Sequence, residues 1–477
     1  MSDENPPVML DQIKMVLKSD PELSQAYDLL NKIIQDEIRK RLSGRDVDSL
    51  ELAPNEEDEE WLEQRCEAAA QYVKAHNMVN LGMRDLELIA SQVMMDNHPL
   101  GPLMTLLHDN TIQNIHLNGP TDCYYFVDGK RYRANLTFKD PDEVYQKIVN
   151  YFNGRSASAK ISQANPIGTV IIPTGQRCHI ATEVADPSPC ITLRNHQPDR
   201  FANFDRLYTD GHAMPAYFPD FMKAVVRARL NVLFAGGVNT GKTTWLRAFG
   251  ATIPDDERLG VVEDDRELML RYLRPNTDTF ELFSRPGNSE GQGYIGMSVL
   301  VRESLRMNAN RLIVGEVRGG EAHYMLRAMS TGFSGSACTI HADVAEDAIP
   351  QLTGYVFENP ESAHDTTQIE QKIGRSIHLI VFLRAVRQKD RSERRLLDKV
   401  VAVHGWANGE VMMKPILEYS ELDDTWYWTA GRASEIGNDN WQRRFRNAGI
   451  NLDDLIPQSV VDSGSAYEAD QRRQGYR

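Results

Sequence analysis

The spacing of apolar and polar residues divides the chain into regions that predict different structures. In residues 1–104, apolar positions recur every three or four residues, as in LDQIKMVLKSDPELSQAYDLLNKIIQDEIRKRL and DLELIASQVM, which predicts amphipathic helices. The acidic stretch ELAPNEEDEEWLEQ between them is typical of a solvated helix face or a linker. We therefore expect an N-terminal helical region over 1–104.

The pattern changes over residues 105–200, where short apolar runs alternate with polar turns. IQNIHLNG and CYYFVDGKRYRANL predict strands, and Asp128 followed by Gly129 is a hairpin turn signal. PDEVYQKIVNYFNG predicts a helix, while GTVIIPTGQRCHIAT and CITLRNH predict further strands. Residues 105–200 are thus expected to form a small α/β domain.

Strands and helices alternate regularly over residues 201–410. The helical pattern FPDFMKAVVRARL leads into the apolar run NVLFAG, and RLGVVED, RLIVGE and SACTIHA are further short runs typical of buried strands. This alternation predicts a parallel sheet covered by helices. Residues 411–477 contain turn residues and short amphipathic stretches, and we treat them as a C-terminal extension that the pattern does not assign.

Composition and charge restrict the compartment and the partners. The chain has 477 residues, enough for two or three domains. No apolar run approaches the length that crosses a bilayer, and the acidic N-terminus MSDENPPVML lacks the features of a secretory signal. The five cysteines are scattered without a CxxC pair, as expected for reduced thiols in the cytoplasm. The net charge of −15 argues against nucleic acid as a partner, because general binding requires neutralising phosphates.

The stretch FAGGVNTGKTTW, residues 234–245, matches the phosphate-binding pattern G-x-x-x-x-G-K-[ST]. It stands between an expected strand and the helical pattern KTTWLRAFG, which is the order that this motif requires. Glycines let backbone N–H groups approach phosphate oxygens, and the start of the helix favours the same anion. We expect Lys242 to reach the β- and γ-phosphates of ATP and the Thr243 hydroxyl to bind Mg²⁺. The expected nucleotide-binding residues are Gly236, Gly237, Val238, Asn239, Thr240, Gly241, Lys242, Thr243 and Thr244.

Two apolar strands downstream end in acidic residues. RLIVGEVRGGEA contains Glu316, and a carboxylate at the carboxyl edge of the sheet would face the phosphates and orient water. VVEDDREL contains Glu263, Asp264 and Asp265, a group suited to Mg²⁺ directly or through water, with Glu263 also a candidate catalytic residue. The alternatives are a strand-capping glutamate at 316 and a solvated acidic loop after the other strand.

The segment TGFSGSACTIHAD, residues 331–343, places glycines and serines before an apolar strand that ends in His341. A neutral histidine there could sense the γ-phosphate or relay its loss, which makes His341 a candidate catalytic residue. The alternative is a histidine whose hydrogen bonds are satisfied in the core or at the strand end, and the pattern does not decide between them.

These four motifs, in this order and spacing, resemble those of the ATPases of type II and type IV secretion systems and type IV pili. VGEVRGGEA is similar to their modified Walker B element, VVEDDREL to their Asp box and GFSGSACTIHAD to their His box. Over roughly residues 80–410 the chain most resembles the CpaF-like ATPases of tight-adherence (Flp) pilus assembly, which share NIHLNGP and RESLRMNANRLIVGEVRGGEA. The family's His box begins Gly-His, whereas this chain has Phe333, which puts in doubt a role for a first histidine.

The resemblance implies a sensor-like N-domain joined to a RecA-like P-loop domain, assembled as a homohexameric ring with ATP between the two domains. In the family, arginines of the N-domain reach the γ-phosphate, and Arg177 in PTGQRCH and Arg194 in CITLRNH stand at the matching positions. Charge-stabilising arginines suit phosphoryl transfer. From the residues alone, each arginine could equally form a surface ion pair.

These features together predict a cytoplasmic ATPase that powers pilus assembly or protein secretion at the inner face of the cell membrane, with inner-membrane platform proteins as partners. A type IV conjugation or secretion ATPase is the near alternative, and an ATP-binding assembly scaffold with weak turnover is another. A nucleic-acid translocase is disfavoured by the acidic charge and the lack of interleaved aromatic and basic residues. The basic stretch 384–395 could meet anionic lipid or a platform protein, or form a solvated hairpin tip.

Overall fold

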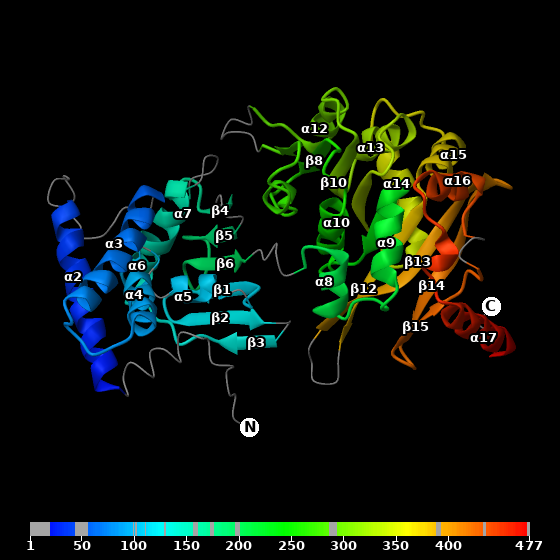
Figure 1. Cartoon of the computed structure of the whole chain (residues 1–477). Helices are drawn as coiled ribbons and strands as arrows, with labels where there is room; N and C mark the ends of the chain where they lie inside the picture. Colours follow the sequence, from blue (N-terminus) through cyan, green and yellow to red (C-terminus); the bar gives the residue numbers. More distant parts are fainter. Residues whose placement is uncertain are drawn as a thin grey trace. The chain divides into compact units, whose positions relative to one another are not determined.

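The chain folds into two compact units, Met1–His196 and Gln197–Arg477, each described by itself (Figure 1). The computed structural model describes residues 20–42, 56–98, 100, 103–109, 111–127, 130–155, 161–171, 176–195, 201–285, 293–387, 393–432 and 436–474. Within these ranges, no helix is both long enough and apolar enough to cross a membrane.

Three helices form the start of the first unit, as the sequence predicts for the described part of residues 1–104. They are α2 (Pro21–Leu42), α3 (Glu56–Ala75) and α4 (Met83–Asn97). Their apolar stripes meet in one core, in which Leu30, Ile34 and Val73 are almost fully buried. The carboxylate of Asp20 accepts hydrogen bonds from backbone N–H groups of the first turn of α2, which caps that helix. The helical pattern expected before residue 20 lies outside the described residues.

A six-stranded antiparallel sheet follows, in the order β3-β2-β1-β6-β5-β4. Its apolar face packs on short helices, and the predicted strands and helix of 105–200 are confirmed where the structure describes them. The predicted turn at Asp128 and Gly129 lies outside the described residues, between the paired strands β2 and β3. The elements are α5 (Leu103–His108), β1 (Asn114–Asn118), β2 (Asp122–Val127), β3 (Lys130–Arg133), α6 (Pro141–Val144), η1 (Tyr145–Val149), α7 (Asn150–Arg155), β4 (Ile167–Ile171), β5 (Arg177–Ala181) and β6 (Cys190–Arg194).

The second unit is built on a nine-stranded sheet in the order β15-β14-β13-β12-β7-β11-β10-β8-β9. The six strands from β12 to β9 run parallel, as predicted, and β13 to β15 continue the sheet in antiparallel pairs. The sheet therefore extends beyond residue 410 into the part that the sequence pattern left unassigned. The strands are β7 (Val232–Gly236), β8 (Leu259–Glu263), β9 (Thr279–Phe283), β10 (Arg311–Val317), β11 (Ala337–His341), β12 (Leu379–Arg387), β13 (Glu393–Ala407), β14 (Glu410–Ser420) and β15 (Thr425–Trp428).

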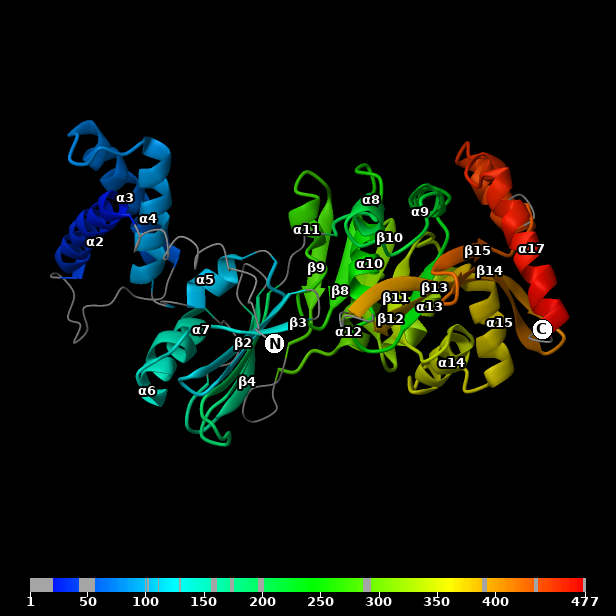
Figure 2. The ribbon, with the colours of Figure 1, turned by 90° about the horizontal axis from the view of Figure 1, so that it is seen from below.

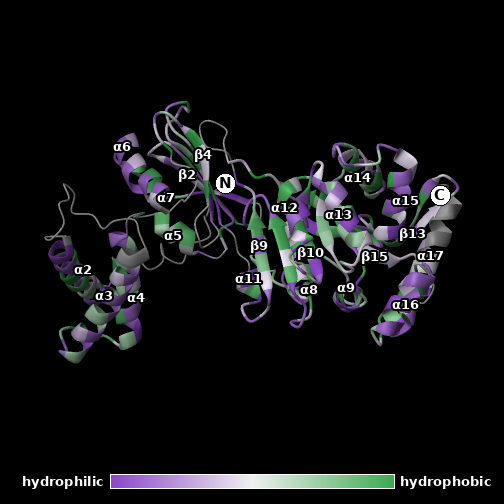
Figure 3. Ribbon diagram, turned by 90° about the horizontal axis from the view of Figure 1, so that it is seen from above, coloured by the Kyte–Doolittle hydropathy of each residue, from purple (hydrophilic) through white to green (hydrophobic). Residues whose placement is uncertain are grey.

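Helices cover both faces of this sheet and enclose two hydrophobic cores (Figure 2). Figure 3 shows hydrophobic stretches along the strands and hydrophilic ones on outer helices such as α16. The helices of one face are α8 (Phe204–Thr209), α9 (Phe218–Arg227), α10 (Lys242–Ala251) and α16 (Asp439–Asn447), and those of the other are α12 (Met297–Ser304), α13 (Glu321–Ser330), α14 (Ala348–Phe357) and α15 (Thr366–Ser376). Shorter or peripheral elements are α11 (Leu270–Leu273), η2 (Ala345–Asp347), η4 (Leu452–Asp454) and α17 (Gln458–Gln474).

The basic stretch 384–395 forms the ends of the paired strands β12 and β13, and residues 388–392 lie outside the described part. Arg384 forms ion pairs with Asp398 and Glu421, and Arg394 pairs with Asp424. Part of the positive charge in this stretch is therefore neutralised within the unit.

Candidate active site

The glycine-rich loop begins at the carboxyl end of β7, a strand that is buried on both faces. Val232 and Phe234 pack into one core, while Leu233 and Ala235 pack into the other. This double burial explains the uninterrupted apolar run before the loop, which is typical of central parallel strands. The loop then leads into α10, so the predicted order of strand, loop and helix is confirmed.

Two loop positions require glycine for steric reasons. Gly236 has φ 153°, and a Cβ atom there would lie 2.4 Å from the carbonyl oxygen of Leu383 on β12. Gly241 has φ 94° at the first residue before α10, a left-handed conformation that residues with a side chain rarely adopt. Asn239 also has a positive φ of 61°, which asparagine tolerates better than most residues. These constraints hold the loop backbone around the start of the helix.

Lys242, the first residue of α10, folds its side chain back over the loop. Its Nζ donates hydrogen bonds to the carbonyl oxygens of Gly236 at 3.0 Å and Gly237 at 2.6 Å. The residue is 7% exposed, and burial lowers its pKa, while the negative charge of Glu316 opposes that shift. The ammonium is thus held in a partly dry site by groups that a phosphate could replace as hydrogen-bond acceptors.

His341 links Lys242 to Glu316. Its Nε2 lies 2.8 Å from the Oε1 of Glu316, and its Nδ1 lies 3.5 Å from the Nζ of Lys242. Since an ammonium can only donate, the network assigns the ring proton to Nε2, which donates to the carboxylate. Strand register produces this arrangement, because His341 of β11 pairs with Gly236 of β7. The structure therefore brings three of the predicted site residues into one polar chain.

Glu263 lies at the same edge of the sheet, at the end of β8, but its environment is closed. It is 2% exposed, and its Oε1 accepts hydrogen bonds from the backbone N–H groups of Glu267 and Leu268. Its Oε2 is buried without a hydrogen-bond partner. Burial raises the pKa of Glu263 to about 8, so the carboxyl is largely protonated near pH 7. The sequence indicated a strand-end acid but gave no sign of this burial.

The acidic residues of 263–265 lie in different surroundings, and Asp264 does not share the buried environment of Glu263. Asp264 forms an ion pair with Arg318, which follows β10. Across the residues that the structure describes, no group of three or more His, Cys, Asp or Glu side chains is arranged to hold a metal ion. A Mg²⁺ site at this edge would rest on fewer protein ligands, together with phosphate and water oxygens, which is the usual manner of binding for this ion.

The two candidate arginines lie side by side in the first unit. Arg177 begins β5, Arg194 ends β6, and the two are direct partners in the antiparallel register. Directly opposed residues have Cβ atoms about 5 Å apart and project from the same face. The sequence gave no indication of this pairing, because the two arginines belong to separate segments.

Phe333 occupies the position at which the resemblance led us to expect a histidine. Its ring is partly buried against the core under α13, and its carbonyl oxygen accepts a hydrogen bond from the hydroxyl of Ser336. The position is therefore part of the packing in this chain.

The fold and the site define the class of protein. A glycine loop between a buried strand and a helix, with carboxylates at neighbouring strand ends, is the arrangement of an α/β nucleotide-binding domain. The sequence model of the type II/IV secretion system protein family matches residues 96–432, so the chain belongs to this family. The chain is an ATPase, as the sequence predicts.

The chain is also similar to individual proteins. The chain is 28% identical over 295 residues to the type IV secretion system protein VirB11 of Bartonella quintana, covering 54% of this chain and 80% of that protein. It is 32% identical over 234 residues to a putative conjugal transfer protein of Mycobacterium tuberculosis, covering 48% and 61%. The X-ray structure of the Legionella pneumophila ATPase DotB matches with 15% identity and a TM-score of 0.45, covering 64% and 81%.

Proposed function

We propose that the second unit is a RecA-like motor domain that hydrolyses Mg·ATP to power pilus assembly or protein secretion, in the manner of the CpaF-like ATPases. The observation that carries this proposal is the polar chain from Lys242 through His341 to Glu316. Strand order supports it, since β11 separates the strand of the glycine loop from the strand of Glu316. Such a spacing leaves room for a phosphate group between the lysine and the carboxylate.

The nucleotide phosphates are bound by the loop from Gly236 to Thr244. Its backbone N–H groups and the positive end of α10 attract the anion. Lys242 exchanges its hydrogen bonds with loop carbonyls for bonds to the β- and γ-phosphates. Val238, at the tip of the loop, is 77% exposed and contributes its backbone alone.

Mg²⁺, when bound, neutralises the phosphate charge that develops during transfer. The hydroxyl of Thr243 and the carboxyls of Glu263 and Asp264 would hold it, directly or through water. The donor set fits the ion, because Mg²⁺ prefers oxygen ligands and the Oε2 of Glu263 is an acceptor without a protein partner. A nearby dication favours the ionised carboxylate and would oppose the raised pKa of Glu263.

Glu316 is the carboxylate that orients the attacking water, and His341 holds it in place. Because the same ring contacts Lys242, it can respond when the γ-phosphate leaves. Glu263 is the second candidate base. Burial keeps its carboxyl largely protonated near pH 7, so it would accept a proton only in the ionised form that bound Mg²⁺ favours.

Arg177 and Arg194 supply positive charge to the γ-phosphate from the first unit. We propose that the assembly is a homohexameric ring that works in the cytoplasm at the inner face of the cell membrane, with inner-membrane platform proteins as partners. The paired position of the arginines supports a joint role, because adjacent guanidinium groups suit the oxygens of one phosphate.

A type IV conjugation or secretion ATPase is the second candidate. It is favoured by the similarity to VirB11 of Bartonella quintana and to the putative conjugal transfer protein of Mycobacterium tuberculosis. The genes beside this one separate the two, since pilin and platform genes would support pilus assembly and relaxase genes would support conjugation.

Substitution of Lys242 tests the nucleotide site. Lys242→Ala should abolish binding of a non-hydrolysable ATP analogue in calorimetric titration, because the phosphates lose their buried cation. Lys223→Ala is the matched control, since Lys223 on α9 is half-exposed and forms ion pairs with Asp205 and Asp220, away from the glycine loop. Near-normal affinity of Lys242→Ala would remove this lysine from the site.

A further inference from the structure

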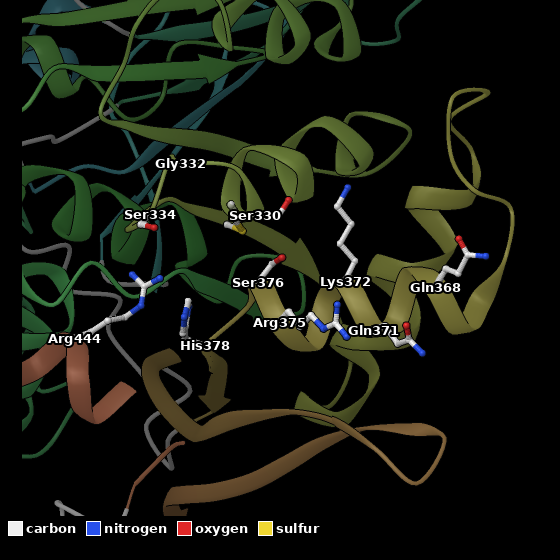
Figure 4. Close-up of a pocket in the computed structure, with 11 residues that line it drawn as sticks. Ser330, Gly332, Ser334, Gln368, Gln371, Lys372, Arg375, Ser376, His378 and Arg444 are labelled. Carbon is white, nitrogen blue, oxygen red and sulfur yellow. The ribbon is translucent and has the colours of Figure 1, made fainter. Parts of the chain in front are cut away.

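A polar cavity lies in the second unit, at the end of the sheet opposite to the glycine loop. Its volume is about 480 Å³. Its lining comes from the end of α13, from the loop that leads to β11, from α15, from the residue before β12 and from α16 (Figure 4). The glycine loop leaves the other end of β7, and five residues of strand at ~3.3 Å each separate the two edges by roughly 16 Å. The cavity is therefore distinct from the proposed ATP site.

All the charged residues that line the cavity are positively charged. Lys372, Arg375 and Arg444 line the cavity, and none of the eleven lining residues is Asp or Glu. Within the described residues, no ion pair involves any of the three cations. Burial lowers the pKa of Lys372 and of Arg444, and neighbouring arginines lower them further. In a chain with a net charge of −15, three cations gathered without a carboxylate are a specific feature.

Buried donors without partners line the same cavity. His378 is 4% exposed, and its Nδ1 accepts a hydrogen bond from the backbone N–H of Asn231 at 3.0 Å. This bond places the ring proton on Nε2, which is buried with no hydrogen-bond partner. Ser376 is 2% exposed, and its hydroxyl is also unpartnered, as is the Nε of Arg444. Each of these groups can donate, so what they lack is an acceptor.

The histidine stays neutral in this position. Burial lowers the pKa of His378 to about 3, with the charge of Arg444 as a smaller cause. It therefore acts as a fixed donor rather than as a further cation, and its binding contribution should not change between pH 6 and 9.

The surrounding framework is rigid, so the donors are held in place without a ligand. Asn231 is fully buried and uses its whole side chain to join three segments. Its Nδ2 donates to the carbonyl oxygens of Met329 and Ser376, and its Oδ1 accepts from the N–H groups of Gly335 and Ser336. A preformed group of donors of this kind reduces the entropy cost of binding.

We propose that this cavity is a second anion-binding site, which takes the diphosphate group of a small ligand. Phosphate oxygens are acceptors that match both the unpartnered donors and the three cations. The volume falls in the range of small-molecule sites, which is larger than one phosphate needs. The proposal is independent of the function proposed above, because it involves no residue of the glycine loop.

Calorimetric titration with inorganic pyrophosphate tests the site. The full chain is first saturated with a fluorescent non-hydrolysable ATP analogue and Mg²⁺, and the fluorescence confirms that this analogue stays bound. We expect one further binding event per chain, weakened about tenfold or more in Lys372→Gln, since a partly buried charge-assisted hydrogen bond is lost. Absence of any pyrophosphate binding to the saturated chain would overturn the proposal.

Matched variants distinguish pyrophosphate binding in the cavity from binding to positive charge elsewhere on the surface. Arg446→Gln removes an exposed cation of α16 that does not line the cavity, and it should bind pyrophosphate like the unmodified chain. Equal affinities of Lys372→Gln and the unmodified chain would overturn the proposal even if pyrophosphate binds. A parallel titration with uridine diphosphate shows whether the ligand is an organic or an inorganic diphosphate. If uridine diphosphate binds more tightly than pyrophosphate, the site belongs to organic diphosphates. If it binds more weakly, the site belongs to the inorganic ion.

Discussion

The ends of β10 and β8 lie next to each other at one edge of the sheet, and each carries a glutamate in opposite surroundings. At the end of β10, the side chain of Glu316 is 36% exposed and bonded to His341. At the end of β8, Glu263 is 2% exposed, with one oxygen bonded to backbone N–H groups and the other unpartnered. Burial raises the pKa of Glu263 to about 8. Two carboxyls in unlike environments can take unlike roles in one reaction, because the environment sets which is ionised.

The largest expected effect comes from the arginines that are proposed to act on the γ-phosphate. The double variant Arg177→Ala, Arg194→Ala should hydrolyse ATP slower by roughly 10³–10⁵, since such arginines stabilise the charge of the transition state. Steady-state phosphate release measures the rate, and light scattering verifies that the variant assembles like the unmodified chain. A variant that assembles and turns over normally would show that the arginines are structural and that the two glutamates work without them.

Replacing His341, which links Glu316 to Lys242, should have the next largest effect. His341→Phe should lower kcat by about 10²-fold, because loss of the imidazole nitrogens frees Glu316 and misplacement of a catalytic group by about 1 Å has such a cost. His341→Gln keeps one donor and one acceptor, so it should retain more activity than the phenylalanine variant. If both variants match the unmodified chain in kcat, the polar chain is not part of the mechanism.

The raised pKa of Glu263 predicts a dependence of stability on pH. The folded pKa of about 8 lies above the unfolded value near 4.5, so the contribution of this group is fully present below pH 4.5 and is lost as the pH rises toward 8. Glu263→Gln keeps the neutral form, and relative to the unmodified chain it should gain on the order of 1 kcal/mol per pH unit across this window. Thermal unfolding at pH 5, 7 and 8.5 measures the difference. Parallel curves for the two chains would mean that Glu263 is not buried as described.

The smallest effect is expected at Phe333, which lies in the loop between α13 and β11, at the opposite end of β11 from His341. Phe333→His should leave the ATPase rate within about threefold of normal, since distant and separate sites usually act independently. It should lower stability by about 1–2 kcal/mol through lost apolar burial. A marked rise in turnover would instead show that a histidine at this position takes part in catalysis.

The sequence predicted the elements of the site because local patterns determine them. The run NVLFAG reads as a buried strand from its own residues, and the glycines at 236 and 241 are required by the loop that they form. The strand-end position of Glu316 and His341 followed in the same way from short apolar runs.

Contacts between distant segments were not predictable from these patterns. The burial of Glu263 depends on how the following loop folds back to donate two N–H groups. The pairing of Arg177 with Arg194 depends on strand register. The bond between Asn231 and His378 joins residues 147 positions apart, and nothing in either segment alone indicates it.

A direct comparison of Glu316→Gln and Glu263→Gln tests the central claim that Glu316 is the catalytic carboxylate. Both amides preserve shape, and Glu303→Gln on the exposed face of α12 serves as the control. Steady-state phosphate release should fall by about 10²–10⁴ in Glu316→Gln, with affinity for an ATP analogue retained, and by less in Glu263→Gln. Normal turnover in Glu316→Gln, together with near-complete loss in Glu263→Gln, would contradict the claim and assign the role to Glu263.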